Sequence, residues 1–235
     1  MAGRVAYHGG LVTDGLVLHL DAARKPSYPG SGDVWYDMSG NGNHGILTNG
    51  PSFDKDRNSG TFEFDGSNDY VNFPGSDTLN IRGSISVGAF TKATTSTWTP
   101  YWNFVSKYNQ YILGINSANQ MAFLVYSDTW YPPNYNSGIW GQSNNTPTDY
   151  HYYVGTYNTV SGILAMYVDG VETASFNIGT QTLNNDTGKM LIGSREVTGG
   201  YYLPKITSNV QIYNRALSAS EVLQNYNALK GRFGL

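Results

Sequence analysis

The sequence contains no cysteine, which excludes disulfide bonds, thiolate zinc sites and cysteine nucleophiles. Charged residues are scarce as well, because they make up 13% of the chain, against about 25% in an ordinary soluble domain. The 14 Lys and Arg residues are scattered and the net charge is −3, so no basic stripe is available to neutralise phosphates. We therefore expect neither nucleic acid nor an anionic membrane as a partner.

Long apolar runs are also missing. The opening residues, MAGRVAYHGGLVTDG, hold no stretch that could form the core of a signal peptide, and no later segment approaches the length of a membrane span. We therefore predict no export signal and no membrane insertion. A chain of 235 residues can bury one full core, since all-β sandwiches of this size commonly stay undivided.

Short alternating runs of apolar and polar residues recur between turn residues, a pattern typical of antiparallel sandwiches. We predict strands at the runs marked by Leu16, Leu18 and Leu20; Phe62 and Phe64; Val71 and Phe73; Ile85, Val87 and Ala89; Ile163 to Val168; and Ile206, Ser208, Val210 and Ile212. The turn 65–68 predicts a hairpin between the second and third runs, and Asp169-Gly170 predicts a type I′ turn after the fifth. In the last run we expect one face in the core and the other, with Asn209 and Gln211, in water.

One helix is predicted near the C-terminus. The Ser218 hydroxyl can cap its first turn while Glu221 reaches back, which forms a capping box. Val222 and Leu229 then share a face that should lie against the sandwich, and Gly231 is placed to end the helix in a left-handed conformation. We expect an N-terminal arm over residues 1–14, the sandwich over 15–229 and a tail over 230–235, with arm and tail becoming ordered on a partner.

Several motifs occur in the order that one family shows. They are Gly15–Ala23 with Trp35–Gly45, Phe64–Val71, Tyr167–Gly170, Ile192–Ser194 and Ile212–Ser218. Together they resemble concanavalin A-like, laminin-G-like jelly-roll domains over about Gly15 to Tyr226. The resemblance implies an all-β fold, a two-sheet antiparallel jelly-roll β-sandwich with one short C-terminal helix. Pro204–Thr207 departs from the Gly-Lys-Ile-Asp that family members often carry there, and the aromatic middle loops have no family counterpart, so ligand residues cannot be transferred.

The ending Glu221–Phe233 resembles the ends of such domains in tailed-phage structural proteins. This narrower resemblance implies a virion localisation, with an extracellular or cell-surface location as the alternative. The implied partners are other virion structural proteins, with the chain in a homo-oligomer or bound to capsid or tail.

Motifs for catalysis are missing. The glucanase branch of the fold carries Glu-x-Asp-x-x-Glu, and no such run occurs among the four glutamates of this chain. No Gly-x-Ser-x-Gly elbow is present, and the four histidines lack the spacing of paired metal ligands or of a triad. We predict that the chain is not an enzyme.

The run from Asp37 to Asn43 alternates oxygen-bearing side chains with spacers, as calcium loops do. Asp37, Ser39 and Asn41 are the candidate ligands, and calcium is the only cofactor considered. The glutamate that completes an EF-hand loop is missing, with Thr48 at its position, and the same residues form Asx turns without an ion. We favour the structural turn and keep calcium as the alternative.

Aromatic residues are abundant, with 19 Tyr and 5 Trp. Two stretches, 91–101 and 127–149, are predicted to be long loops. A cluster of aromatic residues in and around them provides the candidate residues for carbohydrate or partner binding: Trp98, Tyr101, Trp102, Trp130, Tyr131, Tyr135 and Trp140. Tyr and Trp have flat apolar faces and one polar atom, so they can stack on sugar rings or anchor a protein interface.

Three hypotheses for function follow. The first is a non-enzymatic virion surface protein, a capsid decoration or tail-associated component, that binds neighbouring virion proteins and host glycans. The second is a carbohydrate-binding module or adhesin in which the loop tryptophans stack on glycans. The third and least favoured is a glycoside hydrolase that assembles its carboxyl pair from distant aspartates.

Overall fold

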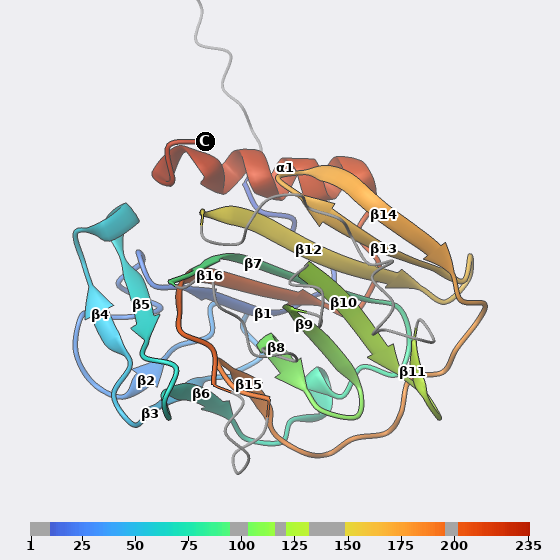
Figure 1. The fold of residues 1–235 in the computed structure, drawn as a ribbon, viewed down its shortest axis with the longest axis horizontal. Coiled ribbons are helices and arrows are strands. Elements are labelled where there is room, and N and C mark those ends of the chain that lie inside the picture. The colour runs from blue at the N-terminus through green and yellow to red at the C-terminus, as the bar shows by residue number, and fades with distance from the viewer. Residues whose placement is uncertain (1–9, 95–102, 116–120, 132–148, 196–201) are drawn as a thin grey trace, which may run out of the picture.

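Two antiparallel sheets pack face to face in the computed structural model, which describes residues 10–94, 103–115, 121–131, 149–195 and 202–235 (Figure 1). Sheet A has the order β14-β13-β12-β7-β16-β5-β4, and β1 pairs with β16 as well. Its strands are β1 (Leu16–Asp21), β4 (Ser52–Asp54), β5 (Thr61–Phe64), β7 (Ile85–Ala93), β12 (His151–Asn158), β13 (Ile163–Val168), β14 (Val171–Asn177) and β16 (Lys205–Tyr213). The predicted all-β sandwich is confirmed.

Sheet B has the order β11-β10-β9-β8-β15-β6-β3-β2. Its strands are β2 (Val34–Trp35), β3 (Gly45–Thr48), β6 (Tyr70–Phe73), β8 (Asn103–Lys107), β9 (Tyr111–Ile115), β10 (Met121–Tyr126), β11 (Trp130–Tyr131) and β15 (Met190–Ile192). The remaining elements are helix α1 (Ala219–Leu229) and the 3₁₀ turns η1 (Arg57–Ser59), η2 (Asp77–Leu79) and η3 (Lys230–Arg232). The stretches predicted to be loops contain strand residues at two points, because β7 runs on to Ala93 and β11 occupies 130–131.

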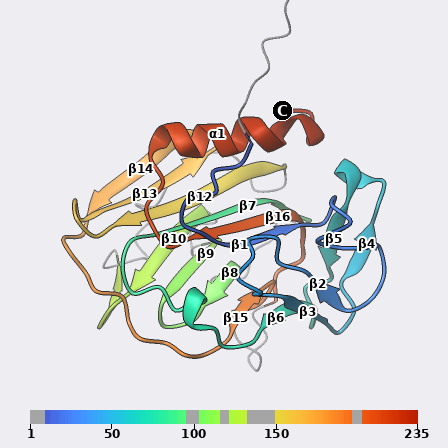
Figure 2. The same cartoon turned by 180° about the vertical axis from the view of Figure 1, so that it is seen from behind.

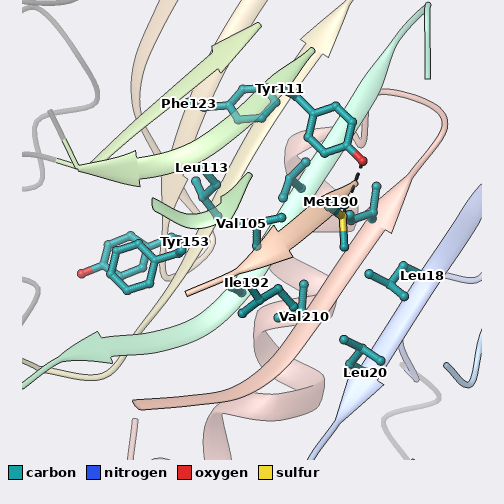
Figure 3. Close-up of a cluster of buried hydrophobic side chains, with 14 of the residues drawn as sticks. Leu18, Leu20, Val105, Tyr111, Leu113, Phe123, Tyr153, Met190, Ile192 and Val210 are labelled. Carbon is teal, nitrogen blue, oxygen red and sulfur yellow. Dashed lines mark hydrogen bonds between the residues drawn. The ribbon is translucent and has the colours of Figure 1, made fainter. Parts of the chain in front are cut away.

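The apolar residues that alternate along the strands meet between the two sheets. Figure 3 shows Leu18 and Leu20 of β1 and Val210 of β16 on one side, with Val105 of β8 and Ile192 of β15 on the other. All five are at most 5% exposed. Burial of this continuous apolar layer is the main driving force for the sandwich, since apolar surface removed from water contributes about 25 cal/mol per Å².

The predicted hairpin between the runs at 62–64 and 71–73 is wrong. Strand β5 belongs to sheet A and β6 to sheet B, so the turn between them crosses from one sheet to the other. The turn is held by the Asp65 carboxylate, which accepts the Ser67 amide at 2.8 Å, and by the Asp69 carboxylate, which accepts the Asp65 amide at 3.1 Å. Both runs still point their apolar residues into the core, because a core between two sheets can be filled from either side.

The tight turn at Asp169-Gly170 is confirmed. Val168 of β13 faces Val171 of β14 across it, and both turn residues have positive φ, 52° and 83°. A type I′ turn requires this backbone geometry, which glycine and aspartate tolerate better than most residues.

The expectation that one face of β16 lies in water is wrong. All nine residues of this strand are buried, because α1, the segment 10–14 and the C-terminal residues cover the outer face of sheet A (Figures 1 and 2). The Tyr213 hydroxyl donates to the Val12 carbonyl and accepts from the Asn225 side chain, both at 3.0 Å. Asn225 also accepts the Val12 amide at 2.8 Å, which fastens part of the predicted arm to the helix.

The capping box at Ser218 and Glu221 is confirmed, but the predicted helix end is not. Helix α1 ends at Leu229 and continues into the turn η3, which contains Gly231. The glycine with left-handed backbone is Gly234, at φ 73°. The tail packs on its own domain, since the Phe233 ring stacks on Phe90 with centroids 4.3 Å apart, and its ordering on a partner stays a prediction.

Candidate functional site

Most residues of the predicted aromatic site cannot be placed. Trp98, Tyr101, Trp102, Tyr135 and Trp140 lie outside the described residues. Trp130 and Tyr131 are the two residues of strand β11, whose backbone pairs with the end of β10. Strand β11 therefore lies at the edge of sheet B, at the end opposite Asn103. The aromatic binding site stays a prediction.

Two strand ends that flank the aromatic segments 95–102 and 132–148, the end of β7 and the start of β12, come together at one end of the sandwich. Strand β7 ends at Ala93, before the segment 95–102, and Ala93 lies opposite Lys205, the first residue of β16. His151, the first residue of β12, follows the segment 132–148 and lies opposite Thr91 of β7. We call this part of the molecule the loop end, defined by Thr91, Ala93, Asn103, His151 and Lys205.

A buried lysine occupies the loop end. Lys205 is fully buried, and its Nζ donates to the Phe104 carbonyl at 2.8 Å. The same nitrogen lies over two rings, 5.0 Å from the centre of Phe64 and 5.3 Å from that of Phe104. Burial lowers the pKa of the Lys205 ammonium well below its usual 10.5, because the charged form loses its hydration. The side chain therefore joins β16 of sheet A to β8 of sheet B as a hydrogen-bond donor.

A histidine–aspartate pair lies at the start of β12. His151 Nδ1 and Asp169 Oδ2 are 2.6 Å apart, and the other carboxylate oxygen of Asp169 accepts the Tyr152 amide at 2.9 Å. The Tyr153 ring meets the imidazole edge to face at 5.7 Å, and burial raises the pKa of the Tyr153 hydroxyl. The pair ties the β13–β14 turn to β12, which holds the chain where it leaves the segment 132–148.

Sequence reasoning treated His151 as ordinary and gave Lys205 no role. The signal for His151 was the Asp169-Gly170 turn. Strand β13 runs antiparallel to β12, so the turn that follows β13 lies beside the start of β12. Lys205 had a weaker signal, namely a lone charge in an otherwise uncharged strand. Among the described residues, no group of three or more His, Cys, Asp or Glu could hold a metal ion.

The predicted calcium loop has the hydrogen bonds of a structural turn. The Asp37 carboxylate accepts the amides of His19, Ser39 and Asn43 at 2.8 to 3.0 Å, and the Ser39 hydroxyl at 2.8 Å. Asn41 donates its side-chain amide to the Leu16 carbonyl at 3.2 Å. Four protein donors thus already stabilise the Asp37 carboxylate, and calcium binding by Asp37, Ser39 and Asn41 stays a prediction.

Comparison with known families agrees with this architecture. Residues 65–223 match the Laminin_G_3 family, described as the concanavalin A-like lectin/glucanases superfamily. The chain belongs to this family. No curated protein matches it by sequence. Within the described residues, no helix is long and apolar enough to cross a membrane.

Solved structures with the same fold include parts of toxins and of an enzyme. The binding domain of Paraclostridial Mosquitocidal Protein 1 superposes with a TM-score of 0.68 at 14% identity, covering 92% of this chain and 52% of that one. The binding domain of botulinum neurotoxin DC in complex with SialylT has the same TM-score and coverage, at 13% identity. Domain 4 of AbnA, a GH43 extracellular arabinanase from Geobacillus stearothermophilus, was solved in complex with arabinotriose. It superposes with a TM-score of 0.65 at 15% identity, covering 90% of this chain and 98% of that one.

The chain thus spans about half the length of the toxin binding domains and nearly all of the arabinanase domain. At these identities the likeness establishes the fold alone. The toxin domains are described as binding domains, and the structures with SialylT and arabinotriose are complexes with sugars. Several solved structures similar to this chain are therefore binding domains, and some similar structures hold a sugar.

Proposed function

We propose that the chain is a non-enzymatic, lectin-like binding domain that recognises glycans through the aromatic residues of its two long loop stretches. The observation that carries the proposal is the strand register, in which the end of β7, before 95–102, lies beside the start of β12, after 132–148. Strand ends far apart in the sequence thereby meet at one rim, where a binding site made of loops can form.

The loop end supplies a rigid base for such a site. Lys205 joins the two sheets at the start of β8, after 95–102, and the His151–Asp169 pair holds the start of β12, after 132–148. A sugar ring that stacks on Trp or Tyr gains dispersion and apolar burial, and these side chains lose little conformational entropy on binding. The proposed contact residues are Trp98, Tyr101, Trp102, Trp130, Tyr131, Tyr135 and Trp140.

A glycan array with the purified chain tests this function. We expect binding to a defined set of glycans, and its loss when Trp98, Trp102, Trp130 and Trp140 are all changed to Ala. Tyr36→Ala is the matched control, because Tyr36 is an exposed aromatic residue on the short segment after β2, remote in sequence from both aromatic segments. Undiminished binding by the fourfold variant would remove the site, and sugar release from a polysaccharide panel would show a hydrolase instead.

A virion role is the second proposal, in which the chain is a capsid decoration or tail-associated protein that binds neighbouring virion proteins. The resemblance of the C-terminal sequence supports it, together with apolar exposure where α1 meets the edge strand β14. Val171 is 64% and Leu223 44% exposed there, and Leu223 packs over Gly170. A neighbouring subunit that covers these side chains would remove apolar surface from water.

Mass spectrometry of purified virus particles tests the virion role. We expect the chain among the particle proteins, and we expect truncation of residues 1–9 to reduce incorporation while the domain still folds. The truncation stops before Val12, because Val12 is buried and bonded to Asn225. Absence of the chain from particles would exclude this role and leave the glycan proposal untouched.

A further inference from the structure

A hollow of about 440 Å³ opens at the β4 edge of sheet A, opposite the edge formed by β14. The segment that follows β1 forms one wall, with Ala22, Ala23, Lys25 and Tyr28. Strand β4 and the turn η1 form the other wall, which includes Phe53. None of the residues that define the loop end contributes to the lining.

The walls are held in place without a ligand. The Tyr28 hydroxyl donates to the Gly32 carbonyl at 3.0 Å, and the Tyr28 ring packs edge to face on Phe53, with centroids 4.8 Å apart. Ser27 donates its hydroxyl to the Tyr36 carbonyl at 2.7 Å and accepts the Asp21 amide at 3.0 Å, which fixes the start of the segment. A preformed hollow binds without a large entropic cost of ordering.

The backbone closes tightly beside the hollow, where Gly60, the residue after the lining residue Ser59, meets the lining residue Ala22. Gly60 has φ 143°, and a Cβ at this position would lie 2.5 Å from the Ala22 carbonyl oxygen. The two residues before it, Asn58 and Ser59, also have positive φ, 50° and 66°. Three successive residues in a conformation that side chains disfavour bring η1 against the segment after β1, and this close approach shapes the hollow.

The charge of the lining has one sign. It contains Lys25 and Lys55 and no acidic residue. Lys55 Nζ contacts both carboxylate oxygens of Asp56, which lies outside the lining, at 2.7 and 2.8 Å. Lys25 is exposed and forms no ion pair within the part of the chain that the structure describes. The hollow therefore combines an uncommitted ammonium group, a second one nearby and two aromatic rings.

We propose that this hollow is a second binding site, specific for a saccharide that carries a carboxylate. The volume suits one or two sugar rings, since ligand sites measure about 300–1,000 Å³. The half-buried Phe53 ring, backed by the buried Tyr28 ring, offers apolar surface to the C–H face of a sugar, and Lys25 and Lys55 attract its carboxylate. The site goes beyond the proposed function, because it shares no residue with the aromatic segments and recognises the charge of the ligand as well as its sugar ring.

Isothermal titration calorimetry with trigalacturonate and with its neutral methyl ester tests the proposal. We expect the acid to bind at least about tenfold more tightly than the ester, and its affinity to fall with added salt, because exposed charges are screened. Changing Lys25 and Lys55 together to Gln should remove this difference between acid and ester. Lys189→Gln is the matched control, an exposed lysine outside the lining that undergoes the same change of charge.

Thermal unfolding of each variant checks that the fold persists, which we expect because both lysines are exposed. The methyl NMR signals of Ala22 and Ala23 should shift with trigalacturonate in the parent chain and stay in place in the double variant. Equal affinity for acid and ester, no heat at millimolar acid, or full binding by the double variant would overturn the proposal. Binding that survives in the double variant but is lost in the fourfold tryptophan variant would assign the acid to the loop end instead.

Discussion

The two faces of sheet A are buried by different means. The inner face packs on sheet B through a continuous apolar layer that includes Phe62, Val87 and Val210. The outer face packs on α1, the segment 10–14 and the C-terminal tail through a mixed layer, in which Phe90 and Tyr152 lie beside polar side chains such as Gln211.

Hydrogen bonds distinguish the outer layer. The Tyr152 hydroxyl donates to Gln211 at 2.8 Å, and Arg232 of the turn η3 donates to the Asp21 carboxylate at 2.7 Å. Buried polar groups cost free energy unless they find partners, so this layer tolerates only a cover that matches its donors and acceptors. The comparison teaches that the inner face depends on the volume of its apolar side chains, while the outer face can be covered only by elements that match its hydrogen-bond donors and acceptors.

Phe62→Ala should have the largest effect. The Phe62 ring contacts Tyr28, Trp35 and Phe53 at centroid distances of 4.7 to 5.4 Å, and its removal leaves a cavity that the two sheets cannot close. We expect a loss of about 3–5 kcal/mol in the free energy of unfolding, measured with urea. Phe62→Leu should lose much less. Equal losses for the two variants would contradict the view that volume governs the inner face.

Lys205→Met should stabilise the protein by about 1–3 kcal/mol near neutral pH, because it removes a buried amine that must lose its proton or its hydration on folding. The Phe104 carbonyl keeps a partner, since it also accepts the Gly193 amide at 3.3 Å. Burial lowers the pKa of Lys205 in the folded state below the usual 10.5. Between the two pKa values the unfolded chain binds one more proton, so the parent gains stability as pH rises through that window.

The gain from Lys205→Met should therefore shrink as pH rises toward 10.5. Urea unfolding at several pH values measures this gain in the free energy of unfolding, with Lys189→Met as the exposed control. A destabilised Lys205→Met variant with the same pH dependence as the parent would show that the amine is bound in its charged form.

Phe233→Ala tests the outer cover. Its ring stacks on Phe90 at an interplanar angle of 2°, and Phe90 is fully buried. We expect a loss of about 1–2 kcal/mol in the free energy of unfolding, from the aromatic pair and its apolar contact. Leu235→Ala, at a residue 43% exposed, is the control and should change little. An unchanged Phe233→Ala variant would mean that the tail is not part of the folded domain.

Glu221→Gln should have the smallest effect, about 1 kcal/mol at pH 7, from the loss of a helix cap and an ion pair. Arg215 donates to both Glu221 carboxylate oxygens, at 2.7 and 3.0 Å, and this bonding lowers the pKa of Glu221 to about 2. The lowered pKa means that the carboxylate stabilises the fold above its usual pKa of 4.5 and that this contribution is lost as pH falls toward 2. Acid titration followed by circular dichroism should show the parent and the variant converging there, and a constant difference would contradict the assignment.

Local features could be predicted from the sequence because they depend on neighbouring residues. Ser218 and Glu221 are three positions apart and cap their helix wherever it lies, and Asp169-Gly170 turns the chain for reasons contained in the dipeptide. The candidate site was less accessible to this reasoning, since the aromatic segments show which residues are available but not which strand ends meet. The partners of Lys205 and His151 lie 101 and 18 residues away along the chain.

The sequence by itself determined the strand type, the helix cap and the β13–β14 turn, because alternation and turn chemistry act within a few residues, and its resemblance to a known family implied the two-sheet fold. Only the tertiary structure decided that β5 and β6 join different sheets, that the outer face of β16 is covered, and that a lysine lies between two rings. It also joined the segment after β1 to η1 around a hollow. These outcomes depend on which distant surfaces meet, and the apolar pattern of a strand is the same whichever sheet it joins.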